Sequence, residues 1–254
     1  MTLKTNLKDQ VALVTGASSG IGRGVASALA DSGCHVFINY PSFERSKNAA
    51  SVVTEIENNG GSASLAVADV RKESEVKAMF DQIAAEAGRL DVLVNNAGIA
   101  RSAPIQDIRL TDWNAIMDVH VTGTFLCTRA ALPMMYDKNY GRIINTASQL
   151  AYKGAPGFAH YTAAKGAILS FTRSLALEIG SRNVTANCVA PGATLTPILD
   201  DVPEDMLNEI KLAIPRQKIA EVSEIIDTYI FLASEGAVHF RGQCLSPNGG
   251  DVFL

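Results

Sequence analysis

Short apolar runs rich in β-branched residues alternate with longer helical patterns over the first two thirds of the chain, which restricts the possible folds more than any other feature. After the first run, Ile21, Val25 and Leu29 recur at the spacing of one helix face. Strands and helices that alternate in this way form a parallel sheet with helices on its faces. The predicted strands are Val11–Val14, Val36–Asn39, Ala63–Ala68, Val92–Val94, Arg142–Asn145, Val184–Val189 and Gln243–Leu245. The sequence therefore predicts an α/β fold with a doubly wound parallel sheet of seven strands.

No pattern in the chain marks a boundary between domains. Its 254 residues contain no internal repeat, low-complexity tract or charged linker, so we expect a single domain over residues 1–254. The segment from Pro191 to Pro215 is the least regular part. Irregular segments of this length are commonly lids or binding loops, and we expect a substrate loop at about 193–215.

The composition argues against several kinds of partner. A net charge of −4, with 47% hydrophobic and 19% charged residues, offers no basic patch for nucleic acid. The apolar runs are far shorter than the ~20 residues that span a bilayer, and Met1–Gln10 lacks the apolar core of a signal peptide. We expect a cytoplasmic protein that acts on a small molecule and binds neither nucleic acid nor a membrane.

Neither the cysteines nor the histidines show the spacing of a metal site. They are Cys34, Cys127, Cys188, Cys244, His35, His120, His160 and His239. Scattered thiols are typical of a reducing compartment, and we interpret these cysteines as small buried apolar residues. We therefore expect no metal.

A glycine-rich turn connects the first predicted strand to the first helix, within Thr15–Gly22. Glycines allow the backbone to approach a pyrophosphate closely, and the N–H groups at a helix start attract its charge. This context indicates a Rossmann-type dinucleotide site, although a tight strand-to-helix connection without a ligand would need glycines too. The expected cofactor contacts in the turn are Gly16, Ser18, Ser19, Gly20, Ile21 and Gly22.

The end of the second strand bears on the choice of dinucleotide. Sites for NAD usually carry an acidic residue there, which holds the adenosine ribose, but this chain has Tyr40 at that place. A 2′-phosphate could then be accepted, within reach of Ser42, Arg45 or Lys47, and we expect Tyr40, Ser42 and Arg45 to contact the cofactor. We expect NADP(H) to be favoured and NAD(H) to remain possible. The alternative is that Arg45 and Lys47 are only solvated charges at a helix start.

Tyr161 and Lys165 lie four residues apart at the start of an alanine-rich helical run, so they share one face. This spacing alone is weak, because such pairs arise often by chance. Ser148 follows the fifth predicted strand, at the edge where parallel sheets bind ligands. It could hold a substrate oxygen beside the Tyr161 hydroxyl, or it could simply cap a helix or loop.

Together these features resemble the short-chain dehydrogenase/reductase family, in its single-domain branch. The family motifs TGxxxGxG, NNAG and YxxxK occur as Thr15–Gly22, Asn95–Gly98 and Tyr161–Lys165. The segment Asn39-Tyr40 resembles that of 3-oxoacyl-carrier-protein reductases and related carbonyl reductases, which mostly use NADPH. Ser19 departs from that group, because many of its members carry a basic residue there.

The resemblance implies a role for each matching residue. Tyr161 would give or take the substrate proton, Ser148 would hold the carbonyl, and Lys165 would bind the nicotinamide ribose and lower the pKa of Tyr161. The further contacts that it implies are Asp69 and Val70 at the adenine, Asn95, Ala97 and Gly98 at the adenosine ribose, and Thr194 and Thr196, after Pro191 and Gly192, at the nicotinamide carboxamide.

His120 departs from the family pattern, which usually has a catalytic Asn at this point. In the family that residue acts mainly through its backbone carbonyl, which holds a water leading to the lysine. Any residue in the same distorted helix can present that carbonyl, so the relay is expected to survive. The His120 ring is then either a structural substitute or a carrier of protons.

The predicted activity is hydride transfer between a nicotinamide and a carbonyl/secondary alcohol pair, with an NADPH-dependent 3-oxoacyl or carbonyl reductase favoured. The alternatives are an NAD-dependent alcohol, polyol or sugar dehydrogenase and a nucleotide-binding regulator without turnover. The expected substrate contacts are Gln149, Leu150, Tyr152 and Phe158. The resemblance also implies a homotetramer, formed by pairing long helices near Trp113–Tyr136 and Tyr161–Gly180.

Overall fold

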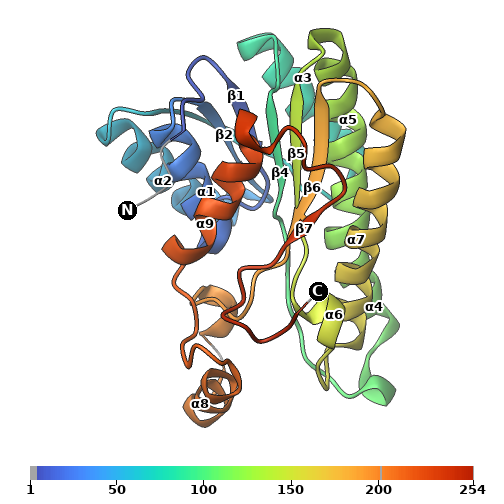
Figure 1. Cartoon of the computed structure of the whole chain (residues 1–254). Helices are drawn as coiled ribbons and strands as arrows, with labels where there is room; N and C mark the ends of the chain where they lie inside the picture. The colour runs from blue at the N-terminus through green and yellow to red at the C-terminus, as the bar shows by residue number, and fades with distance from the viewer. Residues whose placement is uncertain (1–4, 201, 254) are drawn as a thin grey trace.

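The predicted strands are present and form one parallel sheet (Figure 1). The computed structural model describes residues 5–200 and 202–253. Within them the strands are β1 (Val11–Val14), β2 (His35–Tyr40), β3 (Ser62–Val67), β4 (Val92–Asn95), β5 (Gly141–Thr146), β6 (Val184–Val189) and β7 (Cys244–Leu245). Their order in the sheet is β3-β2-β1-β4-β5-β6-β7, so the winding reverses between β1 and β4. This confirms the Rossmann-type fold, and the carboxyl edge at that reversal is where such sheets bind ligands.

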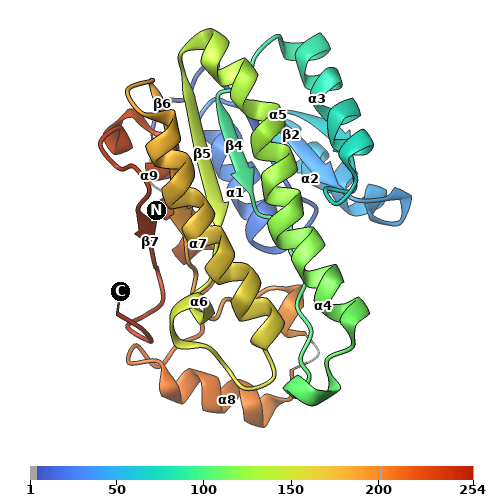
Figure 2. The same cartoon turned by 90° about the vertical axis from the view of Figure 1, so that its right-hand side faces the viewer.

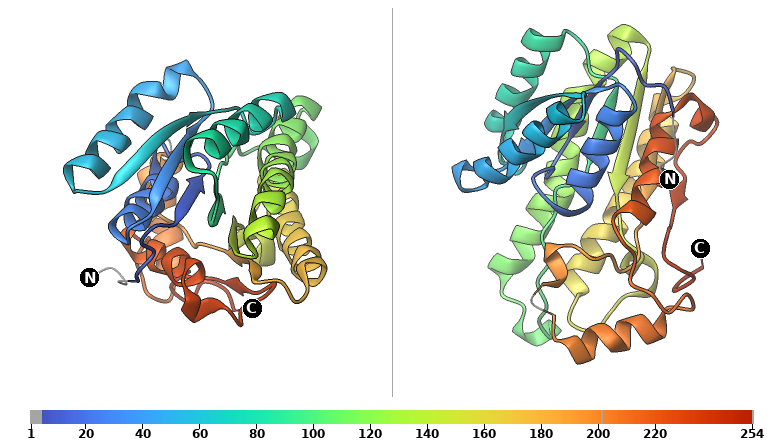
Figure 3. Two further views of the ribbon diagram at one scale, coloured as in Figure 1. Left: turned by 90° about the horizontal axis from the view of Figure 1, so that it is seen from above. Right: turned by 90° about the vertical axis from the view of Figure 1, so that its left-hand side faces the viewer.

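Helices cover both faces of the sheet (Figure 3). On one face lie α1 (Gly20–Asp31), α2 (Ser46–Asn58) and α9 (Ser223–Ala233), and on the other α3 (Glu73–Ala87), α5 (Gly123–Lys138) and α7 (Ala159–Ile179). Side chains of β1 alternate between these layers, because Ala12 and Val14 join the first core and Val11 and Leu13 the second. No helix in the described residues is long and apolar enough to cross a membrane.

The segment predicted as an irregular loop contains a helix, α8 (Glu204–Ala213), so that prediction is wrong in part. Asp201, also in the predicted loop, lies outside the described residues. Pro203 precedes the helix and Glu204 and Asp205 occupy its first turn, a favourable helix start. No residue of α8 is fully buried, although Leu207 and Ile210 share one face of the helix and are partly buried. Figure 2 shows α8 lying beyond the carboxyl edge of the sheet, below α6 (Leu150–Lys153).

The long helix predicted near Trp113–Tyr136 is interrupted. It consists of α4 (Leu110–Met117), a π-helical turn over Asp118–Thr122, and α5. A π-turn inserts one extra residue into the helical ladder and commonly occurs at functional sites. His120 lies in this turn, so the structure contains the helix distortion that the family resemblance implies.

Three of the cysteines are buried free thiols, and Cys244 is partly exposed. Burial raises the pKa of Cys34 and of Cys127 to about 12, so both remain protonated at neutral pH. They behave as the small apolar residues that their scattered positions predict.

Candidate active site

Two glycines of the turn are required by packing alone. Gly16 has a φ of +63°, and a Cβ added there would lie 2.8 Å from the Ala97 Cα atom. A Cβ at Gly22 would lie 2.5 Å from the Gly16 carbonyl oxygen. The turn thus packs closely against the segment that follows β4 and against the start of α1. A tight connection between strand and helix is enough to explain why these two positions are glycines.

The start of α1 has the features of an anion site. Its N-cap residue, Ser19, is extended and makes no side-chain capping hydrogen bond, and the first turn carries no acidic residue. The positive end of the helix therefore stays open to a phosphate. Gly20 faces Thr196, since a Cβ at Gly20 would lie 3.4 Å from the Thr196 Cβ atom. The structure therefore brings together two segments that were both predicted to contact the cofactor.

Asn39 organises this edge of the sheet, and sequence reasoning missed it. Its amide oxygen accepts a hydrogen bond from the Gly16 N–H at 3.2 Å, and its amide nitrogen donates to the Ala66 and Ala68 carbonyls at 3.0 Å each. Only 1% of the residue is exposed. Asn39 thereby fixes the glycine turn to β2 and β3. An Asn near the end of a strand usually indicates a turn residue, so its position in the sequence does not reveal this role.

The NNAG segment is attached to the same turn. The Thr15 hydroxyl accepts hydrogen bonds from the Asn96 and Ala97 N–H groups at 2.9 and 3.0 Å. Asn95, which the resemblance placed at the adenosine ribose, instead directs its amide nitrogen into the interior, towards Thr128 and Asn145. Its amide nitrogen therefore connects β4 to β5 and α5, while its buried amide oxygen has no hydrogen-bond partner among the described residues.

The residues expected at the adenine are mostly covered. Asp69 is 7% and Val70 6% exposed. Arg71 donates hydrogen bonds to both carboxylate oxygens of Asp69, and this contact lowers the pKa of Asp69 below its usual range. Arg71 was not predicted, because an arginine two residues after an aspartate is common on surfaces.

At the end of β2 the structure changes the interpretation of Tyr40. Tyr40 is 8% exposed and belongs to the apolar core under α1 and α2, so its ring packs inward and is turned away from the predicted contact with the cofactor. Ser42 is partly exposed, and Arg45 and Lys47 are exposed. In the described part of the chain neither cation forms a salt bridge. These charges are free to meet a phosphate.

The three residues expected to react with the substrate converge at the carboxyl end of β5. The Ser148 side chain contacts the Tyr161 hydroxyl, and it also accepts a hydrogen bond from the Leu150 N–H at 3.1 Å. Lys165 is 3% exposed and donates to the Thr146 carbonyl at 2.6 Å. Ser148 therefore caps the short helix α6 and touches Tyr161 at the same time.

The expected lowering of the Tyr161 pKa is not found in the protein alone. Burial raises the pKa of Tyr161, and the hydrogen bond from Ser148 opposes this effect. Burial also lowers the pKa of Lys165 from 10.5 to about 7. Near neutral pH the amine is therefore divided between its charged and neutral forms. Its nitrogen lies 5.6 Å from the centre of the Tyr161 ring.

The His120 ring stands beside Tyr161. The two ring centres are 5.4 Å apart and the rings meet edge to face. The His120 Nε2 atom lies 2.8 Å from the Ile99 carbonyl oxygen, and burial followed by the nearby Lys165 lowers the pKa of His120 to about 3. The ring is neutral at physiological pH, which favours the structural interpretation. Gly98 makes room for it, because a Cβ there would lie 2.7 Å from the His120 Cε1 atom.

The segment after β6 lies next to the start of α6. The Gln149 N–H donates to the Pro191 carbonyl at 3.0 Å, and the Thr194 hydroxyl bonds its own segment, at the Gly192 carbonyl. Phe158 lies with its ring centre 6.2 Å from that of Tyr161. Of the other predicted substrate contacts, Gln149 is buried, and Leu150 and Tyr152 are partly exposed.

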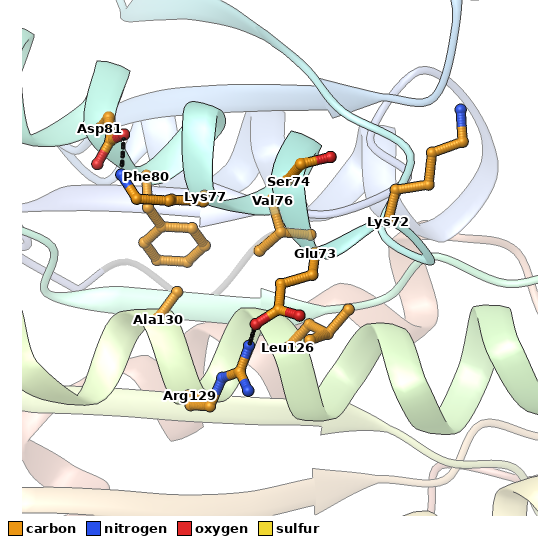
Figure 4. A pocket seen from close by; sticks show the side chains of 10 residues that line it. All are labelled: Lys72, Glu73, Ser74, Val76, Lys77, Phe80, Asp81, Leu126, Arg129 and Ala130. Carbon is orange, nitrogen blue, oxygen red and sulfur yellow. Dashed lines mark hydrogen bonds and ion pairs between the residues drawn. The ribbon is translucent and has the colours of Figure 1, made fainter.

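A separate surface hollow of about 860 Å³ lies between α3 and α5 (Figure 4). Glu73 and Arg129 form an ion pair across it, above an apolar floor that includes Phe80 and Leu126. None of the residues that line it was predicted to bind cofactor or substrate. It is therefore distinct from the converging residues at β5.

Comparison with known proteins decides the family. The sequence model described as short chain dehydrogenase matches residues 10–207. The chain belongs to this family. As a short-chain dehydrogenase it is an oxidoreductase that uses a nicotinamide dinucleotide and acts on a carbonyl/alcohol pair, as the sequence predicted.

Its relatives are similar along almost their whole length. A 3-oxoacyl-[acyl-carrier-protein] reductase of a Synechocystis species is 41% identical, over 98% of this chain and 100% of the relative. The reductase FabG of Staphylococcus aureus is 38% identical, over 94% and 96%. Among solved structures, a gluconate 5-dehydrogenase of Burkholderia cenocepacia, in complex with NADP and tartrate, is 32% identical and superposes with a TM-score of 0.91, over 96% of each chain.

Proposed function

We propose that this short-chain dehydrogenase is an NADPH-dependent reductase of 3-oxoacyl thioesters or related neutral ketones. The observation that carries the proposal is the contact of a buried Tyr161 with Ser148. Burial keeps the tyrosine protonated at neutral pH, which is the form that a reductase needs to protonate its product. The relatives of highest identity named above, both 3-oxoacyl reductases, support this substrate class.

The residues present fit a nicotinamide dinucleotide. The uncapped start of α1 can bind the pyrophosphate through its free N–H groups. Gly20 faces Thr196 across the carboxyl edge of the sheet, where the rest of the dinucleotide would lie. Lys165 would hold the nicotinamide ribose, and Thr194 and Thr196 its carboxamide. When bound, the dinucleotide supplies the hydride for reduction of a carbonyl carbon.

Side chains of the protein would bind the substrate oxygen and supply the proton. Ser148 would hold the substrate oxygen through its hydroxyl, next to the Tyr161 hydroxyl, which donates its proton as negative charge grows on that oxygen. Lys165, with its pKa lowered to about 7, can take up and release a proton near neutral pH. Its anchor on the Thr146 carbonyl fixes the nitrogen behind Tyr161.

A turnover assay tests the proposal. We expect an acetoacetyl thioester of a small thiol to be reduced with NADPH, and gluconate to be oxidised with NADP far more slowly. The absorbance of NADPH at fixed substrate concentrations measures both reactions. Faster turnover of gluconate would support the sugar-acid alternative, which the likeness to gluconate 5-dehydrogenase suggests, and no turnover of any carbonyl or alcohol would support a regulator.

The exposed cations after β2 give a prediction on the cofactor. Replacing Arg45 with alanine removes a charge that can meet the 2′-phosphate, so the KM for NADPH should rise about tenfold, equal to ~1.4 kcal/mol, while the KM for NADH changes little. Steady-state kinetics with both cofactors measure this. Lys77→Met, on the remote helix α3, is the control for a lost surface charge. If the KM values for NADPH and NADH change equally, Arg45 is a solvated surface charge and does not contact the 2′-phosphate.

A homotetramer belongs to the same proposal. The helices expected to pair, α4, α5 and α7, lie on the same side of the molecule (Figure 2). Each carries an exposed large apolar side chain: Leu110 is 72% exposed on α4, Phe125 43% on α5 and Leu177 84% on α7. Apolar side chains left exposed on neighbouring helices are typical of surfaces that pair with another protein. Light scattering at micromolar concentration should give four times the mass of the chain, and a monomer would contradict the proposal.

A further inference from the structure

The end of the chain lies beside α6 (Figure 1). After β7 the segment passes the end of β6, where the Pro247 carbonyl accepts a hydrogen bond from the Gly192 N–H at 3.1 Å. The Asn248 amide then donates to the Val252 carbonyl at 2.8 Å and closes a tight loop. This loop places Asp251 against Gln149, the residue that follows Ser148, and against Lys153 at the end of α6.

Asp251 is held by two side chains of that helix region. One carboxylate oxygen accepts hydrogen bonds from the Gln149 amide and the Lys153 ammonium at 2.6 Å each, and the second oxygen lies 2.6 Å from the same ammonium. The Asp251 side chain is only 7% exposed, against 34% for Lys153. Gln149, adjacent to Ser148, is 5% exposed. Asp251 is therefore held firmly beside Gln149, while the Lys153 ammonium remains partly open to solvent.

We propose that Asp251 is a specificity-determining residue, which neutralises Lys153 on the wall next to Ser148 and so adapts this part of the site to uncharged substrates. The inference rests on the proposed carbonyl reduction and narrows its substrate class to ketones whose nearby groups carry no negative charge. A neutral thioester meets this condition, and a sugar acid does not.

The physical reason is the cost of removing an ion from water. A substrate carboxylate that enters the wall loses hydration, and an ammonium already paired with Asp251 returns little of that energy. Without the Asp251 charge, the same ammonium becomes a partner for the substrate. Without Lys153, the carboxylate of Asp251 would instead repel an anion. The two charges should therefore change selectivity in opposite directions.

The test uses keto acids with two to four carbons between the ketone and the carboxylate, each paired with its methyl ester. Binding to the enzyme loaded with NADP is measured by calorimetry, and reduction with NADPH by absorbance. We expect the wild type to prefer the esters. Asp251→Asn should raise the acid-to-ester ratio of affinities at least about tenfold, Lys153→Met should lower it, and the double variant should return to within about twofold of the wild type.

Lys77→Met again serves as the control, because it removes one lysine of an exposed pair on α3 and should leave the ratio unchanged. A disturbance of the fold would weaken acid and ester together, so it cannot produce opposite shifts. If Asp251→Asn gains no affinity for any of the acids, or both single variants shift the ratio in the same direction, the inference is overturned. The binding measurements test the role of Asp251 even if neither the acids nor the esters are reduced. A failure to reduce any of them would contradict the proposed function and not the role of Asp251.

Discussion

Replacing Tyr161 with phenylalanine is expected to lower turnover at least ~100-fold while leaving cofactor binding nearly intact. The substitution removes the hydroxyl that contacts Ser148 and keeps the ring. The edge-to-face contacts with His120 and Phe158 are retained, so the site should keep its shape. Single-turnover kinetics would measure the chemical step, and fluorescence titration would measure the affinity for NADPH.

Tyr136→Phe is the matched control, since it makes the same chemical change on α5, where the ring stacks with Arg182. That variant should retain its activity. If Tyr161→Phe stays within a few-fold of the wild type, Tyr161 does not supply the proton and another group must be sought.

Replacing Lys165 with methionine should have opposite effects on activity and stability. Turnover should fall at least ~100-fold, because the amine that anchors the proton path and the ribose is lost. The free energy of unfolding should nevertheless rise by roughly 1 kcal/mol or more, or about 2–4 °C in Tm for a chain of this size. A buried amine whose pKa is lowered to about 7 costs stability whenever it must be charged. The lost hydrogen bond to Thr146 offsets part of the gain.

The gain in stability should depend on pH in a defined direction. Below pH 7 Lys165 is charged in both folded and unfolded chains, and the cost of its burial is complete. Between about 7 and 10.5 only the unfolded chain binds the proton, so the cost shrinks as the pH rises and vanishes above 10.5. Thermal unfolding of both proteins at pH 6 and pH 9 measures this. An equal difference in Tm at the two pH values would contradict the lowered pKa.

The centre of the sheet could be predicted because buried parallel strands such as β1 and β4 leave short apolar runs in the sequence, whereas the edge strand β3 is largely exposed and was predicted from its place between two helical patterns. The structure confirms each strand to within one residue at either end, including Val184–Val189. The helix α8 could not be predicted in this way. Leu207 and Ile210 lie at helical spacing and are partly buried, but the helix has only 10 residues and Met206 and Leu212 are exposed, so its apolar pattern is short and mixed.

The positions of site residues could be predicted where a sequence motif determines the backbone conformation. The orientation and pKa of a side chain could not be predicted where they depend on burial by distant parts of the chain. The positions of Ser148, Tyr161 and Lys165 follow from the ends of β5 and the start of α7. That Tyr40 packs inward depends on the helices above it, which no local pattern reports. The raised pKa of Tyr161 likewise results from desolvation by all the residues that surround it, which the spacing of Tyr161 and Lys165 in the sequence does not reveal.

The close fit of Gly98 to the His120 ring limits the paths by which this site can change. The ring fills the volume that a side chain at residue 98 would occupy. A larger residue at 98 is therefore compatible only with a smaller one at 120, and the order of two such substitutions matters. If His120 is first replaced by a smaller residue, it leaves a void that a side chain introduced at residue 98 can later fill. If Gly98 is replaced first, the new side chain collides with the His120 ring. The two positions form one exchangeable unit, which would have to be redesigned as a pair.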